Sequence, residues 1–164
     1  MSELRTNKIY PKDGLPAGAI GGGIIQIVKA EITTPTNQQP GSSSNTGWTD
    51  VTPTATITPS SSSNKVLIVP SVTCITGDNN HTRILLKRGS TSIRIFNYYS
   101  SAGAYSPMTF AAWHLDSPGT TSATTYKYQI AAGSNHTQFM WNYNGPDNTE
   151  PLRLAQVYLV EVSG

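Results

Sequence analysis

Residues 84–96 read ILLKRGSTSIRIF, two apolar runs separated by a short polar segment. Runs of this length, rich in isoleucine and ending in an aromatic residue, are typical of β-strands. Gly89 lies between them, and glycine supplies the positive φ that a tight hairpin turn requires. The stretch therefore predicts a β-hairpin.

Short β-rich runs continue on both sides of this hairpin, separated by turn-forming clusters, and no 3.6-residue periodicity is long enough to indicate a helix. Apolar and polar residues alternate cleanly over 54–58 and 156–162, which indicates strands with one buried face. The chain is therefore predicted to be all-β. The predicted strands are 24–32, 48–51, 54–58, 65–74, 83–87, 92–96, 108–115, 125–131, 138–143 and 153–162.

Two polar runs interrupt the strands, at 34–47 and 59–64, and both consist largely of Ser, Thr, Pro, Gln and Asn. Such runs are expected to bury nothing and to lie as loops at the ends of the fold. Short strands joined by long polar loops favour an antiparallel β-sandwich or jelly roll over a closed barrel. We expect residues 24–164 to form that sandwich as one domain, since 164 residues suffice for a single core.

The first 23 residues differ from the rest, because prolines and glycines break any helix or strand that begins there. They are predicted to form an extended N-terminal arm with a glycine-rich joint at 18–23. The apolar residues of the arm are too few for a core and too many for a fully solvated tail, so we expect the arm to lie on a neighbouring polypeptide. A frayed terminus is the alternative.

Charge is scarce and scattered in this sequence. Charged residues make up 12% of the chain and the formal net charge is +2, with no cluster of basic residues. Nucleic acid is therefore not expected as a partner. Membrane insertion is not expected either, because no apolar run reaches the roughly 18 residues that a spanning helix needs. A neutral surface does favour contact between subunits, since burying Ser or Thr avoids the desolvation cost of a charge.

No catalytic, metal-binding or cofactor-binding motif is found. The sequence has no GxSxG or HExxH motif. His81 and His136 are predicted in turns and His114 in a strand, so no nucleophile and base converge by sequence. The single cysteine, Cys74, lies in an apolar strand pattern and is expected to be buried and inert. We therefore expect no enzyme, no metal site and no cofactor.

Aromatic residues near small and amide residues are the candidate contact sites. Tyr and Trp in such settings are favoured in binding loops, because rigid rings give contact area at low entropic cost. Trp141 comes just before the group that contains Tyr143, Asn144 and Asp147. Trp113, Phe139 and Trp141 could instead fill the core. The candidate surface or ligand-binding residues are Tyr98, Tyr99 and Tyr105, in a segment after the hairpin, and Tyr143, Asn144 and Asp147.

Two stretches carry a family resemblance. Residues 2–14, SELRTNKIYPKDG, resemble the opening peptide of virion proteins from tailed phages, notably tail-fibre-like proteins of marine cyanophages. Residues 57–68, ITPSSSSNKVLI, followed by RILLKRGSTSI at 83–93, are similar to segments of the same group. The resemblance implies a β-rich virion structural protein, often trimeric, that is attached by its first residues. By position, the attachment residues would be Leu4, Arg5, Asn7, Ile9, Tyr10 and Pro11.

The expected function is thus that of a non-enzymatic phage structural protein, made in the host cytoplasm and located in the virion. A small tail-fibre or appendage subunit is the leading hypothesis. Its partners would be itself, as a homotrimer, other virion proteins, and a glycan or protein of the host surface for host attachment. One alternative is a capsid decoration protein that clamps coat subunits, because a compact body with an arm and no stalk or repeat suits a decoration subunit as well as an appendage. The other is a free carbohydrate-binding module.

Overall fold

The computed structural model describes residues 23–32, 47–76, 80–100, 106–132, 140–142 and 155–164. In these ranges every regular element is a β-strand. The strands are β1 (Ile24–Ile32), β2 (Thr49–Ile57), β3 (Lys65–Thr76), β4 (Asn80–Arg88), β5 (Thr91–Ser100), β6 (Ser106–Phe110), β7 (His114–Asp116), β8 (Thr124–Ala132), β9 (Met140–Trp141) and β10 (Ala155–Val162).

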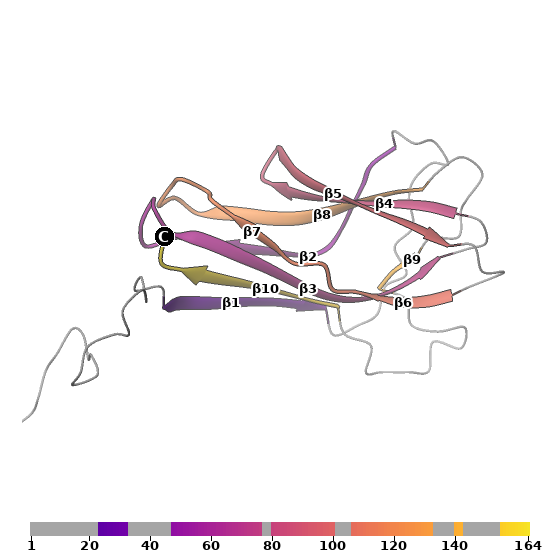
Figure 1. Ribbon diagram of the computed structural model, residues 1–164, viewed down its shortest axis with the longest axis horizontal. Coiled ribbons are helices and arrows are strands. Elements are labelled where there is room, and N and C mark those ends of the chain that lie inside the picture. The colour runs from indigo at the N-terminus through magenta and orange to yellow at the C-terminus, as the bar shows by residue number, and fades with distance from the viewer. Residues whose placement is uncertain (1–22, 33–46, 77–79, 101–105, 133–139, 143–154) are drawn as a thin grey trace, which may run out of the picture.

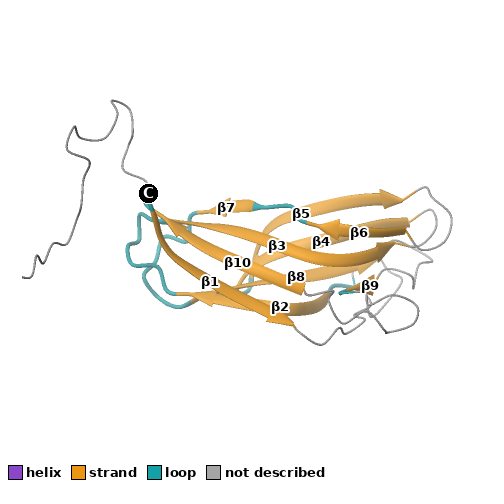
Figure 2. Cartoon of the chain, turned by 90° about the horizontal axis from the view of Figure 1, so that it is seen from below, coloured by secondary structure: helices purple, strands orange, loops and turns teal. Residues whose placement is uncertain are grey.

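Two antiparallel sheets face each other across one core (Figures 1 and 2). One sheet has the order β1-β10-β3-β6, with β7 and β9 also paired to β3, and the other has the order β2-β8-β4-β5. In each sheet a strand from late in the chain lies between two earlier strands, β10 between β1 and β3 and β8 between β2 and β4, which is the connectivity of a jelly roll. The predicted fold class is confirmed.

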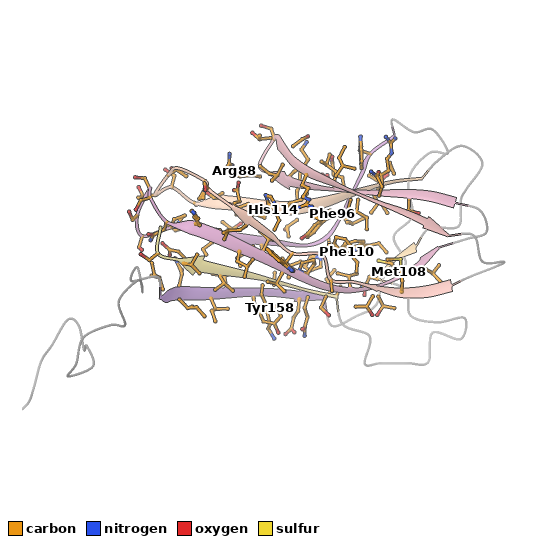
Figure 3. The ribbon with its side chains drawn as sticks, viewed as in Figure 1. Arg88, Phe96, Met108, Phe110, His114 and Tyr158 are labelled. Atoms are coloured by element: carbon orange, nitrogen blue, oxygen red, sulfur yellow. The ribbon has the colours of Figure 1, made fainter. Side chains whose placement is uncertain are left out.

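Alternation along the strands explains which residues form the core. In β10 every second residue is buried, beginning with Ala155, and in β2 the buried residues run from Val51 to Ile57 at the same spacing. The centre of the core is aromatic. Phe110 lies between the two sheets (Figure 3), and its ring centroid is 5.5 Å from those of Tyr128 and Trp141. Such tilted and edge-to-face arrangements are the favourable geometry for aromatic rings.

The predicted hairpin is also confirmed. β4 ends at Arg88 and β5 begins at Thr91, with Ile84 opposite Phe96. Gly89 has φ +55°, the left-handed conformation that glycine adopts without a steric cost. Its N–H donates to the Thr125 carbonyl oxygen at 2.8 Å, so the turn is also tied to β8.

Several strand predictions were wrong in their boundaries. Residues 48–51 and 54–58 are not two strands: β2 runs through Pro53, with a register shift between Val51 and Ala55. An edge strand tolerates proline, because the missing N–H faces no partner. Residues 108–115 are not one strand, since β6 ends at Phe110 and β7 begins at His114. Within the described residues, the predicted strand 138–143 is reduced to Met140–Trp141.

Three further predictions, about one loop and two single residues, were also wrong. The loop at 59–64 does bury side chains, because Pro59 and Asn64 are both buried. His81 lies in β4, opposite Tyr99, and not in a turn. The reason is that the β4-β5 pairing extends beyond the apolar residues from which the hairpin was predicted. Trp113 is 65% exposed and does not fill the core, since it lies between β6 and β7.

Candidate functional site

The two ends of the sandwich differ in what they hold. At one end Ile24 pairs with Val162, Val162 pairs with Lys65, and Val66 pairs with Asp116. The chain enters the domain here, and Ser163 N–H donates to the Gly23 carbonyl oxygen at 3.2 Å. The start of β1 and the C-terminus therefore lie side by side (Figure 2). We call this end, defined by Gly23, Glu161, residues 58–64 and the C-terminus, the root end.

A buried carboxylate organises the root end. Glu161 is fully buried in β10, on the same face as Val157 and Leu159. Its Oε1 atom accepts hydrogen bonds from Asn64 Nδ2 at 2.6 Å and from the Ser60 N–H at 2.7 Å and hydroxyl at 2.9 Å. Its Oε2 atom accepts from Gln26 Nε2 at 2.5 Å. One side chain thus connects the 58–64 loop to β1 at the point where the N-terminal segment enters.

The hydrogen bonds also set the acidity of this carboxyl. Burial raises the pKa of Glu161, but hydrogen bonds from Asn64, Gln26 and Ser60 outweigh burial and hold the pKa at about 2, below the usual 4.5. The carboxylate therefore stays charged in a buried position, which is the state that four donors can satisfy.

Acid is expected to loosen the root end. Because the pKa of Glu161 is lower in the folded chain than in the unfolded chain, its contribution to stability is complete above about pH 4.5 and is lost as pH falls toward about 2. Denaturant unfolding from pH 6 to pH 2 should show a steeper loss for the natural chain than for Glu161→Gln. Parallel curves for the two proteins would contradict the assigned role of Glu161.

A second polar cluster closes the same end near the hairpin. Asp116 Oδ2 accepts from Arg88 Nη1 at 2.8 Å and from the Tyr126 hydroxyl at 2.6 Å. Arg88 Nη1 also donates to the Ser117 carbonyl oxygen at 3.1 Å. Burial and the bond to Asp116 raise the pKa of the Tyr126 phenol above its usual 10.0. This cluster joins β4, β7 and β8, so both sheets are closed by polar contacts at the root end.

At the opposite end the strands finish at Ile32, Thr76, Ser100 and Ala132, and β4, β6 and β10 begin. We call it the far end. Two candidate contact residues are described: Tyr98 and Tyr99 lie on β5, opposite Thr82 and His81. The prediction that they follow the hairpin strand was wrong, because β5 extends to Ser100. Tyr105, Tyr143, Asn144 and Asp147 lie outside the described residues, as do Leu4, Arg5, Asn7, Ile9, Tyr10 and Pro11.

Trp141 is not available as a contact residue. It is fully buried, and its Nε1 donates to the Thr52 carbonyl oxygen at 2.7 Å. Cys74 is buried beside it in the core, where burial raises the pKa of the thiol above its usual 9.0. The prediction that the cysteine is buried is confirmed.

Comparisons with known proteins yield a few structural neighbours. No protein-family model matches the chain, and no curated protein matches it. Among solved structures, the Gx strain of infectious bursal disease virus is similar over 85% of this chain, with 14% identity and a TM-score of 0.45. The VP2 subviral particle of infectious bursal disease virus is similar over 85%, with 13% identity and a TM-score of 0.42. The chain spans about 40% of the length of these viral chains.

Two absences hold for the described ranges alone. No group of three or more His, Cys, Asp or Glu side chains is placed to hold a metal ion there. Those ranges also hold no helix with the length and hydropathy needed to span a bilayer.

The residues that sequence reasoning missed are Glu161 and its donors. The signal was present, because Glu161 falls at an inward position in the alternating segment 156–162.

Proposed function

We propose that this chain is a non-enzymatic structural subunit of a phage virion, most specifically a small homotrimeric tail-fibre or appendage subunit. It attaches through residues 1–22 and presents its far end to the host surface. The observation that carries the proposal is the separation of the two ends. The segment that resembles a virion attachment peptide enters at the root end, while Tyr98 and Tyr99 lie toward the far end.

Two physical features support this arrangement. The root of the arm is held firmly, because Gly23 is bonded to Ser163 and Gln26 is bonded to the buried Glu161. These hydrogen bonds connect the start of β1 to β10, a central strand of its sheet. A force on the arm would therefore be transmitted to the sheet and not to a loop. The 12% charge content also lowers the desolvation cost of packing against other subunits.

Labelling of intact particles tests the proposal. Particles of the phage that encodes the chain would be labelled with gold-conjugated antibodies against residues 24–164 and viewed by electron microscopy. Label on the tail is expected. Label confined to the head would refute the appendage role in favour of a capsid decoration protein. Absence of label, confirmed by immunoblot of purified virions, would refute a virion role altogether.

Host contact has its own test. Tyr98→Ala and Tyr99→Ala should reduce binding of the purified protein to host cells or to a glycan array, with Ile95→Ala on the same strand as the control. Loss of binding with unchanged folding would support the far end as the contact surface. If the natural chain binds neither cells nor glycans, the host-contact part of the proposal and the alternative carbohydrate-binding module both fall.

A further inference from the structure

The outward surfaces of the two sheets differ in chemistry. On the β2-β8-β4-β5 sheet the outer side chains of β2 and β8 are largely polar. The Thr56 and Thr125 hydroxyls lie 2.7 Å apart, and Asp50 accepts from Lys127 Nζ at 2.8 Å and from Gln129 Nε2 at 2.6 Å. The larger apolar residues described on the outer side of this sheet are Leu85, which is buried, and Ile95, which is 47% exposed, so the described strands of this sheet carry no row of exposed apolar side chains.

The outer surface of the other sheet is apolar across four strands. The strand register aligns Ile27 of β1 with Val160 of β10, Val160 with Leu67 of β3, and Leu67 with Leu115 of β7. These residues alternate with core residues, so all four point outward. Ile27 is 58% exposed and Leu115 is 43% exposed. A complete row of aliphatic side chains thus faces away from the core.

Neighbouring residues extend the row in both directions. On one side lie Tyr158 and Val69, which are paired with each other, and Tyr158 points out of the sandwich (Figure 3). Trp113, 65% exposed, comes two residues before Leu115. On the other side Ile25 is 46% exposed. We call this set the apolar outer face; its members are Ile25, Ile27, Leu67, Val69, Trp113, Leu115, Tyr158 and Val160.

A face of this kind is unusual in a monomer. Single exposed apolar side chains are common, but a contiguous apolar patch normally marks an interaction surface. The face also continues to the backbone edge of β1, since β1 pairs with β10 alone among the described strands. An open edge next to an apolar face is a position where another chain adds readily.

We infer that a second copy of this chain covers the apolar outer face, so that the jelly-roll domains associate through the β1-β10-β3-β7 surface. A face that meets the same face of a second copy makes a twofold pair, whereas a ring of three copies needs two different surfaces at each contact, so this inference is independent of the proposed homotrimer. Three properties of the face favour a copy of the same domain over another occupant: its charge, its size and its shape.

Charge makes the face compatible with itself. The charged side chains of its β1 margin are Lys29 and Glu31, which pair at 2.8 Å, and Glu31 also accepts from Gln156 Nε2 at 3.3 Å. This pair is therefore neutral, and Lys65, exposed at the root end of β3, is the other charged side chain on the outer surface of these described strands, so two copies meet with little repulsion between like charges. A partner chosen by charge, such as an anionic membrane, would need a basic margin that these residues do not supply.

Size and shape favour a sheet as the occupant. Four strands about 4.8 Å apart, covered over some three to five residues each, give a flat apolar centre on the order of 250 Å². A stable interface buries about 800 Å² on each partner, with an apolar centre and a polar margin. The neutral residues around the centre, including Gln156, Ser71 and Thr73, supply such a margin. An equally broad surface is needed opposite, and the same face of a second copy provides it.

The test compares matched glutamate variants of the full chain. Ile27→Glu places a charge on the apolar outer face, at one of its most exposed side chains, and Thr54→Glu places one on the exposed outer side of the other sheet. Sedimentation velocity across about 1–100 μM would give the mass of each protein, and thermal unfolding would confirm that both are folded. We expect the natural chain and Thr54→Glu to form the same oligomer, and Ile27→Glu to weaken association by at least about 100-fold.

Other outcomes overturn the inference. A natural chain that is monomeric throughout this range refutes self-association through the face. The same holds if that monomer floats with phosphatidylcholine vesicles, because a lipid surface would then be the occupant. An oligomer unaffected by Ile27→Glu places the contact elsewhere on the chain. Particle labelling separates this inference from the proposed virion role. A monomer found on virions removes this inference and the trimeric state but leaves the virion role, whereas an oligomer lost in Ile27→Glu but absent from virions removes the virion role alone.

Discussion

Trp141→Ala is expected to lower the free energy of unfolding by about 3–5 kcal/mol. The indole is fully buried, lies 5.5 Å from the Phe110 ring and 5.7 Å from the Tyr128 ring, and bonds through Nε1 to the Thr52 carbonyl oxygen. Its removal therefore opens a cavity between the sheets and leaves that carbonyl without its indole donor. Urea unfolding followed by tryptophan fluorescence and circular dichroism measures the loss.

Two further variants define the source of this loss. Trp141→Phe keeps a ring in the core and removes the Nε1 donor, so it should cost about 1–2 kcal/mol. Ile95→Ala, on the exposed side of β5, should change stability by less than about 1 kcal/mol. If Trp141→Ala costs no more than Ile95→Ala, then Trp141 is a surface residue and the jelly-roll core described above is wrong.

Glu161→Gln is expected to lower the free energy of unfolding by about 2–4 kcal/mol. All the partners of the carboxylate are donors: Asn64 Nδ2, Gln26 Nε2 and the N–H and hydroxyl groups of Ser60. Glutamine offers one acceptor oxygen, and its NH₂ group would face another donor. The substitution keeps the volume of the side chain, so it separates the loss of hydrogen bonds from the loss of packing.

Glu31→Gln is the matched control for this prediction. It makes the same chemical change on the neighbouring strand β1, at an exposed position where Lys29 is the ionic partner. Exposed ion pairs contribute little, so a change much smaller than that of Glu161→Gln is expected. Equal effects of the two substitutions, measured by urea unfolding at pH 7, would show that Glu161 is not the organising residue of the root end.

Much of the fold follows from local sequence patterns. The hairpin was predictable because Gly89 and its apolar flanks act over a few residues, and β10 was predictable because 156–162 alternates strictly. The errors arose where distant partners decide the outcome. β2 continues through Pro53 because β8 pairs with the residues on both sides, and β7 exists because β3 extends far enough to pair with it.

The polar groups of the site were harder to predict than the strands. Ser60 and Asn64 look like ordinary loop residues, and only the position of Glu161, about a hundred residues later, makes them its donors. The apolar outer face is similarly hidden, because Ile27, Val160, Leu67 and Leu115 come from four separate segments. Each is unremarkable in its own strand, and only the strand register aligns them as one row.

We propose that the segment before Gly23 attaches the domain to a larger particle. Quantitative mass spectrometry of purified virions would compare the copies per particle of the natural chain and of a chain lacking residues 1–22. Tyr99→Ala, altered at the far end, is the control and should be incorporated normally. We expect at least about a tenfold drop for the truncated chain. Incorporation of the truncated chain at the natural level would refute attachment through this segment.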